Sequence, residues 1–194
     1  MNQDSAAKIV DVVFQVLIDG SKQDYIGEKI SQLEHSLQAA ASAREANADE
    51  EPFWLLFLHD IGQFATSADQ KQMLCDASTL TDLDPTAALD GGGDKKQISV
   101  GVTGHERIGA EYLDRLGFSS KVSTLVESHV PTLSAASKLS LKYQGGPYTQ
   151  EQLKVQLRQW DDAAKVVDLK VPDLESYRSM AIRHLQQQQQ QLSF

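Results

Sequence analysis

The chain has 194 residues and a formal net charge of −9, with 41% hydrophobic and 23% charged residues. This composition is typical of a globular protein with one substantial core. The acidic balance, without a basic stripe or tail, argues against a nucleic-acid or anionic-membrane partner. No apolar run reaches transmembrane length, and the N-terminus lacks the basic start of a signal peptide. The single cysteine, Cys75, allows no internal disulfide, so we expect a cytoplasmic protein.

The expected secondary structure is helical along almost the whole chain. Apolar residues recur every three or four positions, and no alternating strand pattern is recognised. Helices are expected over residues 5–18, 29–46, 53–64 and 104–116, between Ser119 and Pro131, from Thr149 onwards and after Asp173. The expected fold class is therefore all-α, with a single domain over residues 1–185.

Two stretches depart from this helical pattern. Residues 66–102 are rich in Asp, Ser, Thr and Gly, and we expect a long excursion on the surface, because loops of this length are usually lids, binding loops or disorder. The glutamine-rich tail, residues 186–194, is expected to be disordered. His184 lies beside this tail, and we expect its side chain to be exposed to solvent.

The most informative stretch of the sequence runs from Phe53 to Gly62. Apolar residues occupy every side of the helix here, which predicts a buried helix, and His59 and Asp60 then interrupt the apolar run. A buried carboxylate beside an imidazole is costly unless something satisfies its charge. Either a metal ion or a hydrogen bond from a neighbouring side chain would do so.

Further candidate ligands lie on other predicted helices. His35, His105 and His129 each belong to a different helical pattern, and Asp161 lies on one side of the helix that starts at Thr149. Helix bundles build metal sites from side chains that face each other across the core. Any one of these histidines alone is more often an ordinary core or surface residue. Four histidines with two aspartates instead suit two metal ions, and iron, manganese or zinc would accept such ligands.

The order of these residues resembles the HD-domain superfamily, most of whose members are metal-dependent phosphohydrolases. A minority are mixed-valent di-iron oxygenases, and the phosphonate-cleaving enzymes among them share further motifs with this chain. These are Tyr-Ile-Gly-Glu at 25–28, Gly-His-Glu at 104–106, Tyr-Gln-Gly-Gly-Pro at 143–147, Leu-Arg-Gln-Trp-Asp at 157–161 and Asp-Leu-Lys-Val-Pro at 168–172. The resemblance covers residues 24–180 apart from the excursion, and it implies a helical HD bundle with a di-metal site in its core.

The resemblance also implies which residues hold the metals. The cofactor would be two iron ions in a mixed-valent Fe2+/Fe3+ pair. One iron would be held by His35, His59, Asp60 and Asp161, and the other by the shared Asp60 with His105 and His129.

Four more residues take roles from the same resemblance. Tyr25 would close the open position on the first iron, and Glu28 would recognise the substrate amine and assist release of that tyrosine. Arg158 and Ser137 would bind the phosphonate, and the planar fork of an arginine suits this group. The partners would be a small organophosphonate and O2, with neither nucleic acid nor membrane.

The implied reaction is oxidative cleavage of a carbon–phosphorus bond. The expected substrate is (1R)-1-hydroxy-2-(trimethylammonio)ethylphosphonate, which would give glycine betaine and phosphate. The alternative is 1-hydroxy-2-aminoethylphosphonate, which would give glycine and phosphate.

Two positions depart from the phosphonate-cleaving enzymes. Gln63 stands where the enzyme that uses the primary amine has a histidine, so it could hydrogen-bond a substrate without carrying charge. Phe64 beside it adds an aromatic face of the kind that attracts quaternary ammonium groups, which slightly favours the trimethylammonio substrate. Neutral drift explains the residues at these two positions nearly as well. The family's phosphonate-binding lysine has no counterpart within eight residues after His129, and Lys138 and Lys142 are the nearest that follow.

Two other functions stay open. An HD phosphohydrolase would use a metal-bound hydroxide on a phosphate ester, but it has no need for a tyrosine that covers a metal. A catalytically inactive HD module that senses a ligand would have no reason to keep six metal ligands.

Overall fold

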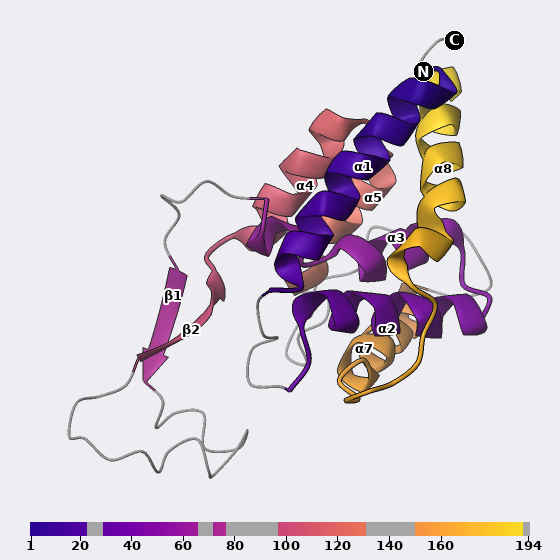
Figure 1. Cartoon of the computed structure of the whole chain (residues 1–194). Coiled ribbons are helices and arrows are strands. Elements are labelled where there is room, and N and C mark those ends of the chain that lie inside the picture. The colour runs from indigo at the N-terminus through magenta and orange to yellow at the C-terminus, as the bar shows by residue number, and fades with distance from the viewer. Residues whose placement is uncertain (23–28, 66–71, 77–96, 131–149, 192–194) are drawn as a thin grey trace.

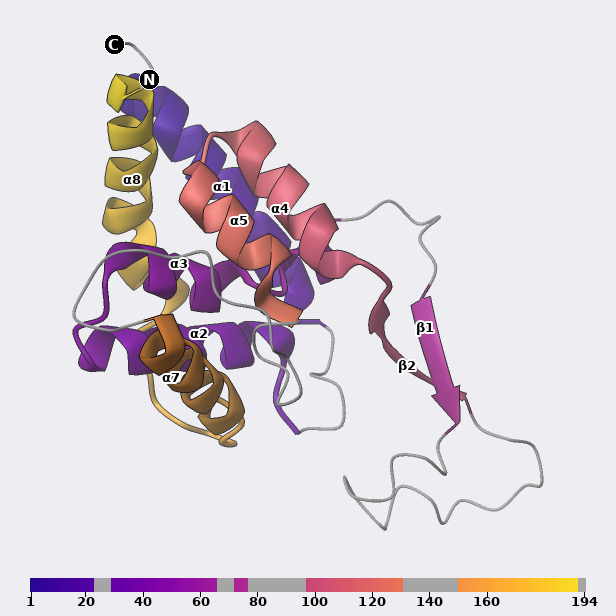
Figure 2. The same cartoon turned by 180° about the vertical axis from the view of Figure 1, so that it is seen from behind.

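The computed structural model describes residues 1–22, 29–65, 72–76, 97–130 and 150–191, and the fold is built mainly from helices (Figure 1). Helices α1 (Gln3–Gly20) and α8 (Arg178–Gln191) pack against each other, with the start of α1 beside the end of α8 (Figure 2). The remaining elements are α2 (Gln32–Glu45), α3 (Glu50–Leu58), α4 (His105–Leu116), α5 (Ser120–Glu127), α7 (Gln150–Ala163) and the short 3-10 helices η1 (Ile61–Gln63) and η3 (Leu174–Tyr177). The expected all-α fold class is confirmed.

Helix α3 forms the centre of the core. Residues 53–58 are each no more than 4% exposed, so the prediction of a buried helix is confirmed. Helices α2, α5 and α7 pack against α3, and the rings of Phe53 and Phe57 stack with centroids 5.7 Å apart. Tyr177 of η3 contacts both rings. Because α3 is covered on its sides, the residues that follow its last turn, His59 and Asp60, emerge inside the molecule.

Local sequence signals fix several of the helix ends near this core. Ser31 and Glu34 form a capping box at the start of α2, and Ser119 caps α5. Helix α4 lies between Gly104 and Gly117, which adopt left-handed conformations with φ of 75° and 88°. The predicted start at Ser119 and stop at Gly117 are both confirmed.

Two strands lie in the segment that was expected to be an irregular excursion. Strand β1 (Gln72–Asp76) pairs antiparallel with β2 (Gln97–Val102), and the ribbon projects away from the helices (Figures 1 and 2). These strands were not predicted from the sequence. Residues 97–102 do alternate apolar with polar or small residues, but six such positions after a glycine- and aspartate-rich stretch give a weak signal. Strand β2 leads directly into α4, so the ribbon is joined to an element of the core.

Two expectations for the C-terminal region are wrong. Helix α8 continues to Gln191, so residues 186–191 are helical rather than disordered, because glutamine forms helices well and α8 packs on α1. His184 is 3% exposed. Its Nδ1 donates to Oε1 of Glu50 at 3.1 Å, and its Nε2 accepts from the backbone amide of Ser119 at 3.4 Å. The polar neighbours of His184 in the sequence concealed the face of α8 that turns inward.

Candidate metal centre

The six side chains that the sequence singles out as metal ligands converge from separate elements onto one place in the core. Asp161 and His105 keep small exposed areas of 14% and 12%, and the other four are buried. His35 lies on α2, His59 caps the end of α3, Asp60 precedes η1, His105 begins α4, His129 follows α5, and Asp161 lies in the last turn of α7.

The first group of donor atoms is built on α2, α3 and α7. Nε2 of His35 lies 3.2 Å from Nε2 of His59 and 3.1 Å from Oδ1 of Asp161. The Asp161 oxygen is also 3.3 Å from Nε2 of His59. Oδ2 of Asp60 lies 3.2 Å from the same His59 nitrogen. His35, His59 and Asp60 therefore form one close group of donors, and Asp161 lies against its two imidazoles.

The second group is built on α4 and the end of α5. Nε2 of His105 lies 3.1 Å from Nε2 of His129. Oδ1 of Asp60 lies 3.3 Å from the His105 nitrogen and 3.8 Å from the His129 nitrogen. Asp60 thus presents one carboxylate oxygen to each group, which is the arrangement of a carboxylate that bridges two cations.

The spacing and type of these donors fit metal ions. Two ligands at right angles, each about 2.1 Å from a cation, lie about 3.0 Å from each other. The donor pairs of 3.1–3.3 Å described above come close to this value. A mixed set of imidazole nitrogens and carboxylate oxygens suits iron, manganese or zinc. The residues present would therefore hold two ions with Asp60 between them.

Each histidine is oriented by a hydrogen bond from its second ring nitrogen. Nδ1 of His59 faces the carbonyl oxygen of Leu56 at 2.9 Å, and Nδ1 of His129 faces that of Val126 at 2.6 Å. The same contacts join Nδ1 of His35 to the carbonyl of Ala164 at 2.9 Å, and Nδ1 of His105 to the carbonyl of Val102 at 3.2 Å. Because a carbonyl only accepts, Nδ1 carries the proton in all four, and each Nε2 is left to bind a metal.

The electrostatics of the metal-free centre follow from burial and from the two aspartates. Burial favours the neutral form of His59, but Asp60 and Asp161 outweigh it and raise the pKa of this imidazole to about 9. Burial also opposes the charge of Asp60, yet the neighbouring imidazoles hold the pKa of its carboxyl well below the usual value. Burial and the nearby His59 lower the pKa of His129 to about 4. The aspartate charge is therefore compensated inside the core.

A close approach of two backbones holds the halves of the centre together. A methyl group on Gly62 would overlap the carbonyl oxygen of His105 and would lie 2.7 Å from the amide nitrogen of Gly109. Gly62 follows Asp60 by two residues, and His105 begins α4. Only a residue without a side chain lets η1 pack this tightly on α4, so Gly62 sets the spacing between Asp60 and His105.

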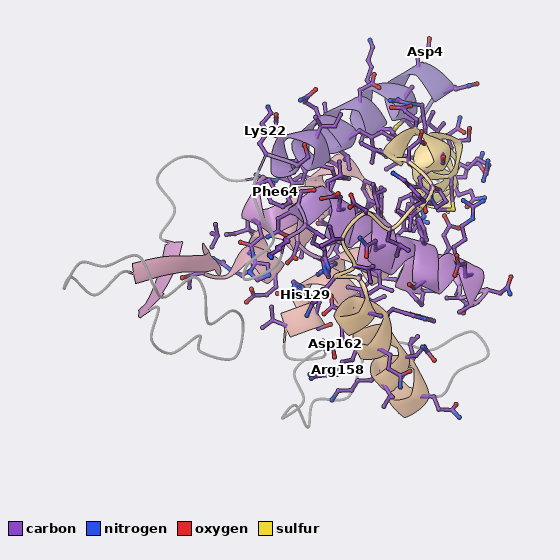
Figure 3. All side chains as sticks on the ribbon, turned by 60° about the horizontal axis from the view of Figure 1, so that its bottom comes forward. Asp4, Lys22, Phe64, His129, Arg158 and Asp162 are labelled. Carbon is purple, nitrogen blue, oxygen red and sulfur yellow. The ribbon has the colours of Figure 1, made fainter. Side chains whose placement is uncertain are left out.

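Of the four further residues that take roles from the resemblance, three lie outside the described part of the chain and one lies on α7. Tyr25, Glu28 and Ser137 lie outside the residues that the structure describes, so their roles stay predictions. Arg158 lies on α7, and its Nε donates to Oδ2 of Asp162 at 3.1 Å; Figure 3 shows both residues on the helix that carries Asp161. Its role in phosphonate binding also stays a prediction.

Gln63 and Phe64 have structural contacts that the sequence did not reveal. Oε1 of Gln63 accepts a hydrogen bond from the backbone amide of Val102 at 2.7 Å, and contact with a substrate stays a prediction. The ring of Phe64 lies against Gly20 at the end of α1, on the side of the molecule near Lys22 (Figure 3). This contact with α1 weakens the argument that Phe64 forms the wall of a substrate site.

Sequence reasoning missed a buried glutamine that supports the first group. Gln38 is 3% exposed, and its amide makes two hydrogen bonds to Val166, donating to the carbonyl at 2.8 Å and accepting from the amide at 3.0 Å. Val166 follows Ala164, whose carbonyl orients His35. The sequence places Gln38 three residues after His35, on the same face of the helix, but it does not indicate the partner 128 positions away.

Comparison with known proteins identifies the family. The model of the HD domain matches residues 33–168. The chain belongs to the HD-domain family. It is 30% identical to a hydroxymethylphosphonate dioxygenase of Gimesia maris over 88% of this chain and 85% of that protein. It is 27% identical to the [1-hydroxy-2-(trimethylamino)ethyl]phosphonate dioxygenase (glycine-betaine-forming) of Leisingera caerulea, covering 90% and 89% of the two chains.

These relatives confirm the resemblance to the phosphonate-cleaving branch of the HD-domain family, since both are named as dioxygenases that act on phosphonates. Among the residues that the structure describes, no helix combines the length and apolar character needed to cross a membrane.

Proposed function

We propose that this protein is a di-iron oxygenase that uses O2 to cleave the carbon–phosphorus bond of a 1-hydroxyphosphonate. The observation that carries the proposal is the position of Asp60, which presents one oxygen to His59 and the other to His105. This arrangement suits a pair of ions held side by side. Two relatives that align with most of this chain are named as phosphonate dioxygenases, and their names supply the reaction class.

The side chains of the centre would form one set of ligands for each of the two ions. His35, His59 and Asp161 would hold one iron, and His105 and His129 the other, with Asp60 shared. The mixed-valent iron pair would supply the redox chemistry with O2, which none of these side chains can provide. The protein would fix the ligands, exclude water and orient the substrate.

Arg158 is the candidate anchor for the phosphonate. It precedes Asp161 by three residues on α7, so the two side chains leave the helix on the same side. Its guanidinium would bind phosphonate oxygens through charge-assisted hydrogen bonds. When the phosphonate binds, Arg158 would contact it in addition to Asp162 or in place of Asp162. The Asp162 carboxylate can lose this contact because it is half exposed to solvent.

The substrate that we propose is 1-hydroxy-2-(trimethylammonio)ethylphosphonate, with the primary-amine compound as the alternative. The support is Glu28, a carboxylate at the position that recognises a cationic nitrogen in the resembling enzymes, together with the named activity of the Leisingera caerulea relative. Hydroxymethylphosphonate is a second candidate, because the Gimesia maris relative shares 30% identity with this chain. That compound has no nitrogen, so Glu28 would have no partner in it.

The decisive experiment follows O2 uptake and phosphate release together. The iron-loaded protein would be incubated separately with the trimethylammonio, the primary-amine and the hydroxymethyl compounds. We expect equal amounts of O2 consumed and phosphate released, fastest with the trimethylammonio compound. Phosphate release from esters without O2 uptake would instead indicate a phosphohydrolase and would overturn the proposal.

Tyr25 gives a second test that separates the oxygenase from the hydrolase. The Tyr25→Phe variant removes the phenol that would cover the first iron but keeps the ring. We expect unchanged iron content and faster oxidation of the ferrous centre by O2 when no substrate is present. Full iron loading with an unchanged oxidation rate would remove Tyr25 from the mechanism.

A further inference from the structure

Val102 joins the ribbon to the second group of metal ligands through both of its backbone groups. Its carbonyl oxygen is 3.2 Å from Nδ1 of His105, and its amide donates to Oε1 of Gln63 at 2.7 Å. The carboxylate of Glu106 is 3.7 Å from the same histidine nitrogen, beyond hydrogen-bonding distance. The carbonyl of Val102 is therefore the contact that orients the His105 ring.

We propose that Gln63 is a positioning residue for the second metal ion, acting through Val102 on His105. This role rests on the metal centre of the proposed function, but it does not depend on which substrate is cleaved. Gln63 would fix the peptide of Val102, and this peptide would hold the His105 ring with its Nε2 toward the ion. The residue is a ligand of neither ion, so its effect is on the orientation of one histidine.

The four histidines differ in how firmly their orienting carbonyls are held. The carbonyls of Leu56 and Val126 belong to the last turns of α3 and α5, so helix packing already fixes them. Val102 is the last residue of β2, which belongs to a ribbon that projects from the body (Figure 1). Val102 is itself 7% exposed, so this residue reaches the core, and Gln63 adds the hydrogen bond that fixes its peptide.

Gln63 is well placed to make this contact because it is tied to the bridging ligand. Its backbone amide donates to the carbonyl oxygen of Asp60 at 2.8 Å, so its main chain is fixed on one ligand of the second ion. Its side chain reaches the peptide that orients another ligand, His105. One glutamine thus links two of the three ligands of the second group.

The first group of ligands has a similar supporting glutamine, Gln38, which serves as the control for Gln63. Gln38 holds Val166 by two hydrogen bonds, and the nearby Ala164 carbonyl orients His35. Loss of the Gln38 amide should therefore weaken binding of the first ion, whereas loss of the Gln63 amide should weaken binding of the second ion. Groups that hydrogen-bond a metal ligand directly typically change metal affinity by about 10–100-fold. These two glutamines act one contact further out, so we expect effects at the lower end of that range.

The test is a calorimetric titration of the metal-free protein with Mn2+, comparing wild type with Gln63→Leu and Gln63→Glu. We expect Gln63→Leu to weaken the binding of one of the two ions by about tenfold, the lower end of the range for groups that bond a ligand directly. Gln63→Glu keeps an oxygen that accepts from Val102, so it should bind both ions nearly as wild type. If Gln63→Leu does not fold, Gln63→Asn, whose shorter side chain cannot reach Val102, gives the same comparison.

A double-mutant cycle identifies the path of the effect. In a His105→Ala variant, adding Gln63→Leu should cause no further loss of Mn2+ affinity. In a His35→Ala variant, adding Gln63→Leu should lower the affinity as much as it does in wild type. A loss that persists in full on His105→Ala, or wild-type affinity in Gln63→Leu, would overturn the inference. Two ions bound by wild type without any phosphonate cleavage would refute the proposed reaction but leave this inference standing.

Discussion

The contact between η1 and α4 predicts a large effect from adding a single methyl group. In Gly62→Ala, the new Cβ would overlap the carbonyl oxygen of His105 and would lie 2.7 Å from the amide nitrogen of Gly109. An ordinary contact between a carbon and a backbone atom is about 3.5 Å, so α4 has to move away from η1 by at least about 0.8 Å. Both sides of this contact are backbone, so no rotamer change can relieve it.

The displacement is larger than a metal centre tolerates. Functional groups have to be held within about 0.5 Å of their working positions, and the shift would separate Asp60 from His105 by more than this. Overpacking a tight contact costs about 1–3 kcal/mol, and the rigid neighbours of Gly62 place this variant at the upper end. For a chain of this size, about 3 kcal/mol corresponds to a melting temperature lower by about 6–12 °C.

The measurement combines thermal unfolding of the metal-free protein with its metal stoichiometry. Gly117→Ala is the matched control: it lies at the other end of α4, has a φ of 88°, and its added methyl would meet no atom closer than 3.8 Å. The control should lose about 1–2 kcal/mol from left-handed strain and still bind both ions. If Gly62→Ala matched the control in both metal content and stability, the spacing argument for Gly62 would be refuted.

Three further predictions test other parts of the molecule. Asp60→Asn leaves one ligand oxygen for two ions, so the metal content measured by mass spectrometry should fall from about two to about one per chain. Arg158→Ala should raise the KM for the phosphonate about tenfold or more without changing iron content, as measured by phosphate release. Glu50→Gln should lower the free energy of unfolding at pH 7 by about 0.5–1 kcal/mol, since the carboxylate is partly exposed. Because hydrogen bonding to His184 lowers the pKa of Glu50, this loss should vanish as the pH falls through that lowered pKa, in urea titrations at several pH values.

The candidate ligands could be singled out from the sequence because their polarity contrasts with their apolar surroundings. A histidine and an aspartate directly after an apolar helix, such as His59 and Asp60, need either a metal ion or a hydrogen-bonded partner to offset the buried charge, so the pair marks a candidate site. His35, His105 and His129 stand out less when taken singly, and only their number pointed to a metal centre. Their division into two groups came from the resemblance, and the donor distances agree with it.

The supporting contacts could not be predicted, because they join residues that are far apart in the sequence. Nothing local indicates that Gln38 reaches Val166 or that Gln63 reaches Val102, and a glutamine is an ordinary residue on a helix. The same limit explains the error at His184, whose partner Glu50 lies 134 positions away in the chain. Periodicity reports which face of a helix is apolar, but a polar residue on a buried face is recognised only once its partner is known.

The error at the end of α3 has a physical reason that bears on function. The apolar pattern predicted one helix over residues 53–64, whereas α3 ends at Leu58 and η1 begins at Ile61. The last turn of a helix leaves carbonyls without a partner in the next turn, and Nδ1 of His59 uses one of them, that of Leu56. His129 uses the carbonyl of Val126 in the same way just beyond α5. A histidine placed directly after a helix therefore finds an orienting acceptor three residues back while its Nε2 points onward, away from that helix. This geometry requires the helix to stop before the ligand pair, so the break that the periodicity missed is part of how the metal centre is built.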